Sequence, residues 1–542
     1  MITEIYQLTK RNKLSSSLEK LLKVSLSLAQ LKAIHHALSF LSAPYQLATG
    51  CHLNVHKQPL TFDDKPYLKG IYLDARPKVI QKSVQCGISE MLICTALSYA
   101  KYGFSVLYVL PSHPLRGRFV HNRIDPLFMI VPEYQKLLKD AAGESDSVML
   151  KHFGDGVINF VGSNTVNEFI EFPADVVIID EMNRCVQGNL SMAYDRLDAS
   201  TIKHRVMVGN PTHEDFGITS AFNNTDKKAW FVSCKSCNER QPLEWLVNIA
   251  EEIDENEHRL LDEGWDEKSG REIQVFCRKC KEPIDRLGHG EWVKQNTESD
   301  NSGYHISQLY SVNTPIAELW DLWTDAQGNP TNLQVFWNSK MGLPYSPKGS
   351  RLSRSELHAC TQDYLLKSGS EKQRCSMGVD VGKLLHVRIS SLTSDGKRKA
   401  EYIGVVKEFS EVSALVERYK VRYAVIDMYP ETRVVKDFQA QHHGVWLCKF
   451  PSNSAAVAAK VIRKDEDEQI LDVDRTQAFD NLVASIRKKE LILPKNAGLI
   501  ADYYDQLRAP VRIYDKEKDR NSWQEGSQAD HYFLAEVYDA IA

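Results

Sequence analysis

The sequence lacks several features that would assign its 542 residues to a simple class. It has no excess of charge of one sign, because 67 Lys and Arg stand against 71 Asp and Glu. Binding to nucleic acid would therefore have to come from local patches. It has no apolar run of about eighteen residues, and its start lacks the order of a signal peptide. We therefore expect a soluble protein of a reducing compartment, with no membrane partner.

A disulfide framework, internal repeats and low-complexity tracts are also missing. Four of the 11 cysteines form two C-x-x-C pairs and the others are scattered singly. This pattern suits metal binding and buried thiols better than disulfides. A chain of this length is too long for one ordinary core, so we expect two or three domains.

A phosphate-binding loop of the usual form, G-x-x-x-x-G-K-[ST], is missing as well. The nearest stretch is QKSVQCGISEM, in which Ile88 stands where the lysine belongs. This stretch follows a short predicted strand, PKVI, and precedes a helical pattern, which is the context of such a loop. Gly87 would let backbone N–H groups approach a phosphate, Ser89 would bind the metal ion, and Lys82 would fold back to supply the missing charge. The alternative is a solvent-exposed lysine before an ordinary helix start.

The strongest pattern in the first half is PADVVIIDEMNR. The run VVII predicts a strand that ends at Asp180 and Glu181, and open α/β sheets bind ligands at this end of their strands. This is the form of a Walker B element, in which Asp180 would hold Mg²⁺ and Glu181 would polarise the attacking water. The alternative is a buried strand followed by a solvated acidic turn. Another apolar strand, VMVG, leads to Asn210 and Thr212, where a sensor of the γ-phosphate would lie.

Two cysteine pairs, Cys234-x-x-Cys237 and Cys277-x-x-Cys280, are separated by 39 residues. Four thiolates form a closed tetrahedral set that suits structural Zn²⁺ and leaves no open position for catalysis. The spacing exceeds the usual range of about 15–20 residues, so we expect the charged intervening segment to loop out. An iron–sulfur centre and free thiols are the alternatives.

The second half contains three predicted strands, a helix and a fourth strand, with Asp380 on the first strand and Asp427 at the end of the fourth. This is the ribonuclease H order, in which the first and fourth strands are neighbours and their acids converge. Such carboxylates hold two metal ions about 4 Å apart for phosphodiester cleavage. Asp530, which begins the last predicted helix, is our expected third ligand, with His531 beside it and Asp539 as its competitor. The alternative is that each acid is solvated at the end of an element.

These patterns predict an α/β protein with a P-loop-type parallel-sheet ATPase domain, a ribonuclease H-like nuclease domain and a small zinc-binding insertion. A helical segment precedes the ATPase domain, and an aromatic-rich connector precedes the nuclease domain. The expected segments are 1–60 (helical), 61–230 (ATPase), 231–296 (zinc-binding insertion), 297–375 (connector) and 376–542 (nuclease).

With a P-loop-like ATPase before a ribonuclease H-like nuclease, the sequence resembles the large subunit of tailed-phage terminases, in the lambda-like, gpA-type branch. The early lysine of KSVQCGIS is typical of the deviant loop of that family. The resemblance covers roughly residues 60–542. It is carried by KSVQCGIS, VVIIDE, GNPT, the paired C-x-x-C, SGYHISQLYS, FWNSKMGLPY, GVDVG, VIDMYPE and DHYFLAEVYDA.

The resemblance implies an ATP-driven motor that translocates double-stranded DNA into a procapsid and cuts concatemeric DNA by two-metal hydrolysis. It implies ATP with Mg²⁺, and Mg²⁺ or Mn²⁺ at the nuclease site, beside the Zn²⁺ expected from the cysteines. The implied partners are a small terminase subunit, the portal protein of the procapsid and further copies of the chain in a homo-oligomeric ring. The implied location is the host cytoplasm and, transiently, the portal vertex.

The phosphate loop departs from the family pattern, because such loops often carry an arginine where Gln85 stands. Arg123, or Arg116 and Arg118, are candidates to supply that charge, including in trans as an arginine finger. Two other functions compete with the packaging motor. A helicase-nuclease of repair or recombination would need further helicase motifs after GNPT, where the chain instead enters the cysteine pairs. A zinc-stabilised DNA-binding or capsid-vertex scaffold would not hydrolyse nucleotide.

Overall fold

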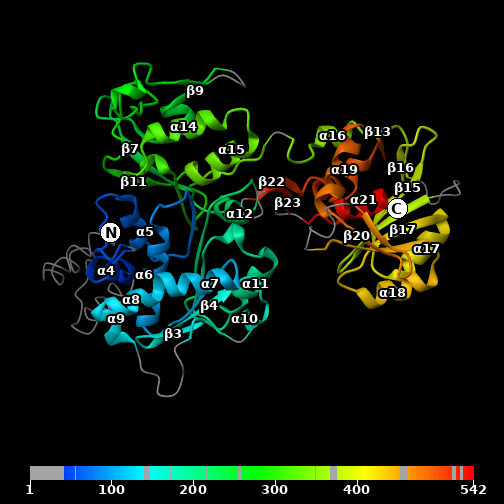
Figure 1. Cartoon of the computed structure of the whole chain (residues 1–542), viewed down its shortest axis with the longest axis horizontal. Helices are drawn as coiled ribbons and strands as arrows, with labels where there is room; N and C mark the ends of the chain where they lie inside the picture. Colours follow the sequence, from blue (N-terminus) through cyan, green and yellow to red (C-terminus); the bar gives the residue numbers. More distant parts are fainter. Residues whose placement is uncertain are drawn as a thin grey trace. The chain divides into compact units, whose positions relative to one another are not determined.

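The chain folds into two compact units, residues 1–345 and 346–542, drawn in Figure 1. The structure is a computed structural model. It describes residues 42–542 except 55, 139–146, 171, 215, 254–257, 348, 367–374, 452–461, 516–519 and 525–528. Most of the helical segment predicted over 1–60 therefore lies outside the described residues.

The first unit is built on a ten-stranded sheet whose central strands run parallel. The strand order is β11-β7-β12-β1-β6-β5-β2-β4-β3, with β8 paired to β7. The apolar runs PKVI, VVII and VMVG, which were predicted as strands, form β1, β5 and β6. The bounds are β1 Lys78–Lys82, β2 Ser105–Leu110, β3 Leu150–Phe153, β4 Gly156–Gly162, β5 Val176–Ile179, β6 His204–Gly209, β7 Lys228–Ser233, β8 Arg240–Pro242, β11 Gly290–Val293 and β12 Ser302–Ile306.

Both faces of this sheet are covered, which explains why its strands are apolar throughout rather than alternating. Within β5, Val176 and Ile178 enter one buried apolar cluster, whereas Val177 and Ile179 enter another. Helix α6 belongs to the first cluster, and α11 and α12 belong to the second. The helices are α4 Ala43–Gly50, α5 Tyr67–Leu73, α6 Ile88–Lys101, α7 His113–Phe119, α8 Asp125–Ile130, α9 Pro132–Leu137, α10 Asn167–Ile170, α11 Gln187–Asp195, α12 Gly217–Asn223, α13 Trp245–Asn248, α14 Ile316–Ala326 and α15 Pro330–Val335.

The sheet extends beyond 61–230, the segment predicted for the ATPase domain. Strand β7 leads into the first cysteine pair and β11 follows the second. Strand β12, from the predicted connector, lies between β7 and β1 and pairs with β1 in parallel. The predicted insertion and the first part of the predicted connector therefore share a sheet with the ATPase segment. Because these strands pair with partners that are distant in sequence, no local sequence pattern shows where the ATPase segment, the insertion and the connector begin and end.

The second unit is built on a nine-stranded sheet of order β13-β21-β16-β15-β14-β17-β18-β20-β19. Strands β14, β15 and β16 pair antiparallel in succession, and β17 pairs with β14 in parallel, so the predicted first and fourth strands are neighbours. The strands are β13 Thr361–Gln362, β14 Cys375–Val381, β15 Leu385–Leu392, β16 Arg398–Val406, β17 Val421–Asp427, β18 Val445–Lys449, β19 Ile462–Asp465, β20 Ile470–Val473 and β21 Leu491–Pro494. The helices are α16 Arg354–His358, α17 Phe409–Tyr419, α18 Thr432–Gln441, α19 Arg475–Arg487, α20 Tyr503–Leu507 and α21 His531–Ile541.

Helix α21 lies very close to β14 and β15. A Cβ atom added to Gly378 on β14 would stand 2.1 Å from the carbonyl oxygen of Ala535 and 2.2 Å from the backbone nitrogen of Asp539, so this approach requires glycine. Charged groups fill the space under the helix: Arg388 of β15 is fully buried and donates to Glu536. The last helix is therefore held in one register on the sheet.

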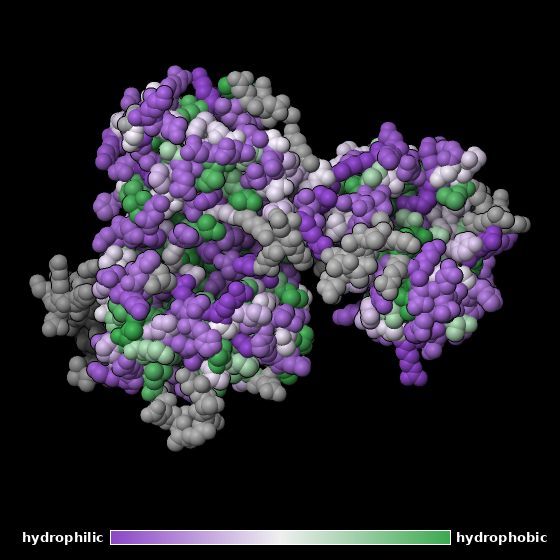
Figure 2. All heavy atoms as spheres, viewed as in Figure 1, coloured by the Kyte–Doolittle hydropathy of each residue, from purple (hydrophilic) through white to green (hydrophobic). Residues whose placement is uncertain are grey.

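None of the helices in the part of the chain that the structure describes is both long and apolar enough to cross a membrane. On the face drawn in Figure 2, hydrophobic residues form small separate groups among hydrophilic ones.

Candidate functional site

The loop between β1 and α6 has a backbone suited to phosphate. Gly87 has φ +81 and directly precedes α6, and a Cβ atom there would approach the Leu68 side chain to 3.0 Å. Gln85 also has a positive φ of 57. Ser89 lies in the first turn of α6. The start of a helix offers unpaired N–H groups and a partial positive charge, which together favour an anion.

Lys82 ends β1 and points toward the acidic pair after β5 rather than into solvent. Its Nζ donates to Oε1 of Glu181 at 3.0 Å and to Oδ1 of Asn210 at 3.2 Å. Only 5% of the lysine is exposed. Burial lowers the pKa of Lys82, but Glu181 and Asp180 outweigh it, so that the pKa lies above its usual value. The amine is therefore a buried positive charge beside the phosphate loop.

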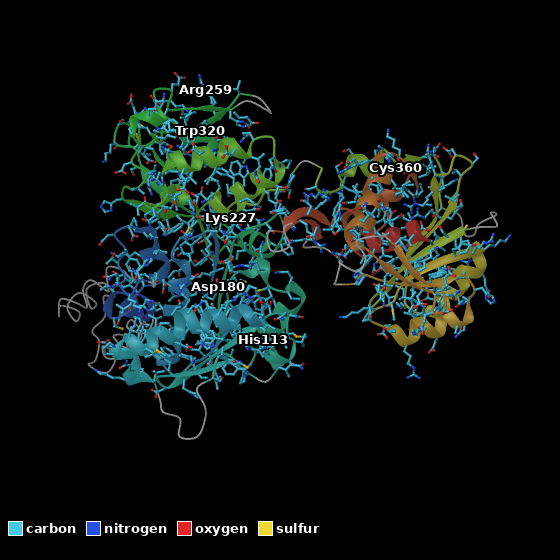
Figure 3. The ribbon with its side chains drawn as sticks, viewed as in Figure 1. His113, Asp180, Lys227, Arg259, Trp320 and Cys360 are labelled. Atoms are coloured by element: carbon cyan, nitrogen blue, oxygen red, sulfur yellow. The ribbon has the colours of Figure 1, made fainter. Side chains whose placement is uncertain are left out.

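Asp180 follows β5 and is labelled in Figure 3. It is 4% exposed, and its Oδ2 accepts a hydrogen bond of 3.1 Å from the Tyr108 hydroxyl. Its Oδ1 is buried without a hydrogen-bond partner among the described residues. Burial and the charge of Glu181 raise the pKa of Asp180. A divalent cation would satisfy the bare oxygen, so Asp180 fits the Mg²⁺ ligand predicted from the sequence.

Glu181 and Asn210 contact Lys82, whereas the hydroxyl of Thr212 contacts Asn183. Glu181 has φ 53, an uncommon left-handed backbone for a residue other than glycine. Asn210 also donates from Nδ2 to the carbonyl oxygen of Lys82 at 2.9 Å. Thr212 instead accepts a hydrogen bond of 3.0 Å from Asn183. Asn183 and Tyr108 were not predicted, because no local pattern shows which polar side chains reach a strand end.

Arg123 is held beside the first turn of α6. Its Nη2 lies 2.5 Å from Oε1 of Glu90, and His52 bonds the other oxygen of that carboxylate at 2.9 Å. Arg116, a second candidate from the sequence, pairs with Glu168 at 2.8 Å. Both arginines therefore have acidic partners within their own chain.

The phosphate loop is held in place by residues from beyond the predicted ATPase segment. The backbone N–H of Val84 donates to the carbonyl oxygen of Ser339 at 2.9 Å, and Gln308 donates to the carbonyl oxygen of Val84 at 3.1 Å. Gly342 has φ 65, and a Cβ atom there would stand 2.6 Å from the backbone nitrogen of Ser83. The stretches SGYHISQLYS and FWNSKMGLPY thus shape the loop. In the sequence, the signal that these two stretches matter was that both carry the resemblance to the terminase family.

The four paired cysteines come together, with all four sulfur atoms within 4.8 Å of one another. The Sγ atoms of Cys234 and Cys280 are 3.6 Å apart, and those of Cys237 and Cys277 are 3.8 Å apart. Four sulfurs at about 2.3 Å from one Zn²⁺ ion stand about 3.8 Å apart. Gln241 donates to the sulfur of Cys277 at 3.0 Å. The residues present therefore fit tetrahedral Zn²⁺.

Each cysteine pair lies on the same kind of turn. The residue after each pair, Asn238 or Lys281, has a left-handed φ of 58 or 61. Its N–H donates to the carbonyl oxygen of the first cysteine of the pair, at 2.9 Å from Asn238 to Cys234 and 3.0 Å from Lys281 to Cys277. The same turn, used twice, presents two sulfurs from each pair to a common centre.

Asp380 and Asp427 stand side by side at the ends of neighbouring strands. Val379 of β14 is in register with Ile426 of β17, and the two acids are the next residues on these parallel strands. Asp380 is 3% exposed. Burial and the charge of Asp380 raise the pKa of Asp427 to about 6, although the backbone N–H of Tyr429 opposes the rise. Two carboxylates this close repel unless they share a cation or a proton.

Asp530 precedes helix α21 as predicted, but its neighbour His531 is the residue that contacts Asp380. His531 Nδ1 lies 2.8 Å from Oδ2 of Asp380. The carboxylate of Asp530 faces Arg475, whose Nη2 is 3.8 Å away. Asp539 lies near the other end of β14, where Ser376, Ser390 and Arg398 donate to its carboxylate. The structure thus brings together Asp380, Asp427 and His531.

The two units have the architecture of an ATPase joined to an endonuclease, and the chain matches sequence models for both. The model for the phage terminase large subunit gpA, ATPase domain, matches residues 58–295. The model for the terminase large subunit gpA, endonuclease domain, matches residues 301–398. The chain belongs to the gpA family of phage terminase large subunits, and it carries the ATPase and endonuclease domains of a DNA-packaging motor.

Among solved structures of large terminases, that of bacteriophage HK97 is similar to this chain in fold. The HK97 bacteriophage large terminase is 10% identical over 93% of this chain and 99% of its own, with a TM-score of 0.52. The large terminase of a thermophilic bacteriophage is 10% identical over 85% and 92%, with a TM-score of 0.29. The large terminase nuclease of thermophilic phage G20c with bound magnesium is 15% identical over 36% and 90%, with a TM-score of 0.24. No curated protein matches the chain.

Proposed function

We propose that Lys82, Asp180 and Glu181 hydrolyse ATP to drive double-stranded DNA into a procapsid, and that Asp380 and Asp427 cut concatemeric DNA. The observation that carries the first half is the contact of Lys82 with Glu181 and Asn210. Lys82 ends β1, and Glu181 and Asn210 lie just after β5 and β6. These three strands are neighbours in the sheet. They therefore meet where a parallel sheet binds its ligand.

In the ATP cycle, the loop at Gly87 binds the phosphates, and Ser89 and Asp180 hold Mg²⁺. The cation neutralises charge on the phosphate oxygens when it is bound. Lys82 turns from Glu181 toward the β- and γ-phosphates, because a phosphate competes for its amine. Glu181 is then released to orient the attacking water, while Asn210 and Thr212 sense the γ-phosphate. Arg123 serves a neighbouring subunit only if its pairing with Glu90 opens.

At the nuclease site, Asp380 and Asp427 would hold Mg²⁺ or Mn²⁺ ions, which would supply activation of water and stabilisation of the leaving 3′-oxygen. Asp530 remains the proposed third carboxylate. It directly precedes the helix whose first residue, His531, contacts Asp380. The four paired cysteines hold one structural Zn²⁺.

The proposed partners are double-stranded DNA, a small terminase subunit, the portal protein and further copies of this chain in a ring. The protein would act in the host cytoplasm and, during packaging, at the portal vertex of the procapsid. The support for these partners is the family to which the chain belongs.

Two substitutions test the nucleotide site. Lys82→Ala and Glu181→Ala should each abolish DNA-stimulated ATP hydrolysis and leave metal-dependent cutting of DNA largely intact. Steady-state phosphate release measures the first activity and gel analysis of cut DNA measures the second. Lys69→Ala, at an exposed position in the first unit, is the matched control. Normal ATP hydrolysis by both site variants would refute the nucleotide assignment.

A further inference from the structure

We propose that Asp380, His386 and His531 form a nitrogen-containing metal site in the nuclease centre, which binds first-row transition ions such as Mn²⁺ in preference to Mg²⁺. The inference rests on the proposed role of Asp380 in cutting DNA. It assigns to the centre two histidine ligands in addition to its carboxylates.

The sheet itself brings the first two ligands together. Asp380 on β14 is directly paired with His386 on the antiparallel strand β15. Directly paired residues project from the same face of a sheet with Cβ atoms about 5 Å apart. The short connection between these strands sets the pairing, so the relation between the two side chains is fixed by the backbone.

Helix α21 brings the third ligand to the same point. His531 is its first residue, and its Nδ1 lies 2.8 Å from Oδ2 of Asp380. One ligand atom from each of Asp380, His386 and His531 lies within 4.8 Å of those of the other two. Ligands bound at about 2.1 Å to one ion stand no more than about 4.2 Å apart. The two imidazole rings, which are stacked in this structure, would have to turn so that a nitrogen of each points to the ion.

His386 is a buried histidine with one unsatisfied ring nitrogen. The residue is 7% exposed, and its Nδ1 is buried without a hydrogen-bond partner among the described residues. A buried polar atom of this kind destabilises the fold unless it is satisfied. Tyr532 packs edge-on against the ring at 4.8 Å and fixes its orientation. The ring of His531 stacks on it at 4.7 Å, and the 42% exposure of the His531 side chain leaves the group open to solvent.

Asp380 lies between two possible metal positions that differ in their ligand atoms. Strand β14 lies between β17 and β15, so Asp380 has the carboxylate of Asp427 on one side and the imidazole of His386 on the other. Neighbouring strands are about 4.8 Å apart, which is close to the separation of about 4 Å in two-metal centres. One position is therefore all oxygen, and the other contains nitrogen.

The two positions should differ in the ions that they prefer. Mg²⁺ binds oxygen ligands in strict octahedral geometry and seldom accepts imidazole. Imidazole suits the transition ions, and affinity rises from Mn²⁺ toward the later metals of the row. The histidine side should therefore hold Mn²⁺ or Co²⁺ well and Mg²⁺ poorly. Cutting with Mn²⁺ should exceed cutting with Mg²⁺, and the two histidines should be responsible for the difference.

The direct test uses the full-length zinc-loaded protein and Mn²⁺ alone as the probe. Electron spin-echo spectra of bound Mn²⁺ should show coupling to imidazole nitrogen, and labelling the histidines with ¹⁵N should change that coupling. His386→Gln and His531→Gln should each weaken Mn²⁺ binding about tenfold or more and remove part of the nitrogen coupling. His443→Gln, at an exposed position of the same unit, should leave both unchanged. Spectra without nitrogen coupling in the unsubstituted protein would overturn the proposal, and that measurement does not depend on whether a variant folds.

A second measurement separates this inference from the proposed nuclease site. The ratio of cutting rates with Mn²⁺ and Mg²⁺ should fall about tenfold in either histidine variant. Asp427→Asn should abolish cutting with both ions. If Asp427→Asn fails to cut but the histidine variants keep the unsubstituted ratio, only the metal-preference inference fails. If Asp427→Asn cuts normally, the proposed nuclease site fails.

Discussion

At the scale of single residues, the proposed nucleotide site and the proposed nuclease site both contain charged side chains whose burial costs free energy. Asp180 carries a bare buried oxygen, and Asp427 has a pKa raised to about 6. The buried amine of Lys82 is balanced by Glu181, since both are held in one hydrogen-bonded group. Such groups weaken the fold locally, and they gain their favourable interactions when phosphate or metal ions arrive.

The pKa of Asp427 predicts a stability effect with a definite sign. The folded-state value of about 6 lies above the ordinary value of 3.8. The folded state therefore favours the protonated form, and the stability that this provides is lost as the pH rises through about 6. Asp427→Asn should stabilise the second unit at pH 8 by about 1–2 kcal/mol, without added divalent metal, and have little effect at pH 4. Denaturant unfolding at the two pH values measures this, and a destabilised variant at pH 8 would contradict it.

At the scale of helices and strands, much of the site could be predicted because strand ends are local features. The patterns KVI, VVIIDE and VMVGNPT placed Lys82, Asp180 and Asn210 at strand ends, and these ends meet in the sheet. The position of Asp530 could not be fixed in the same way, since one residue turns a helix by about 100°. His531 rather than Asp530 thus contacts Asp380. The pairing of His386 with Asp380 could be predicted from the sequence, because GVDVGKLLHV has the pattern of a hairpin with a short turn.

Helix α21 depends on Gly378, and this predicts a strong effect from one methyl group. Gly378→Ala should destabilise the second unit by about 2 kcal/mol or more, because the added Cβ atom would collide with the backbone of α21. Cutting of DNA should fall as well, because His531 is the first residue of that helix and Asp530 directly precedes it. Gly382→Ala is the control, because its Cβ atom would meet nothing closer than 3.6 Å. Thermal unfolding and gel assays of cutting compare the two, and equal stability would contradict the close packing.

The cysteine site is tied to the ATPase sheet, and this predicts an effect of zinc on ATP hydrolysis. Strand β7 runs directly into Cys234, and Cys234 and Cys277 belong to the apolar cluster that includes Ile80 of β1. Cys237→Ser should therefore lose the single Zn²⁺ ion, lower the unfolding temperature of the first unit and reduce ATP hydrolysis. Cys51→Ser, at a cysteine outside the set, should keep the zinc. Elemental analysis gives the zinc content, and a zinc-free protein with full ATPase activity would contradict the coupling.

At the scale of the whole molecule, one chain carries two chemistries on two separate sheets. The ATPase group belongs to the unit that ends at 345, and the nuclease group belongs to the unit that begins at 346. The units share no strand in the described parts of either sheet. Variants of one centre should therefore leave the chemistry of the other intact, although packaging of concatemeric DNA requires both.

The proposed ring leads to a prediction that can be tested only with mixtures of variant and unsubstituted subunits. If subunits hydrolyse ATP in turn around a ring, hydrolysis in one subunit depends on hydrolysis in the subunit before it. One Lys82→Ala subunit should therefore stop the whole motor. Adding Lys82→Ala protein to unsubstituted protein should then reduce packaging of linear DNA more steeply than in proportion to the fraction added. Adding Asp380→Asn protein should leave this packaging unchanged, because linear DNA needs no cut to begin. Nuclease-protected DNA in procapsids measures both mixtures, and a linear decline with Lys82→Ala would show that the subunits act independently.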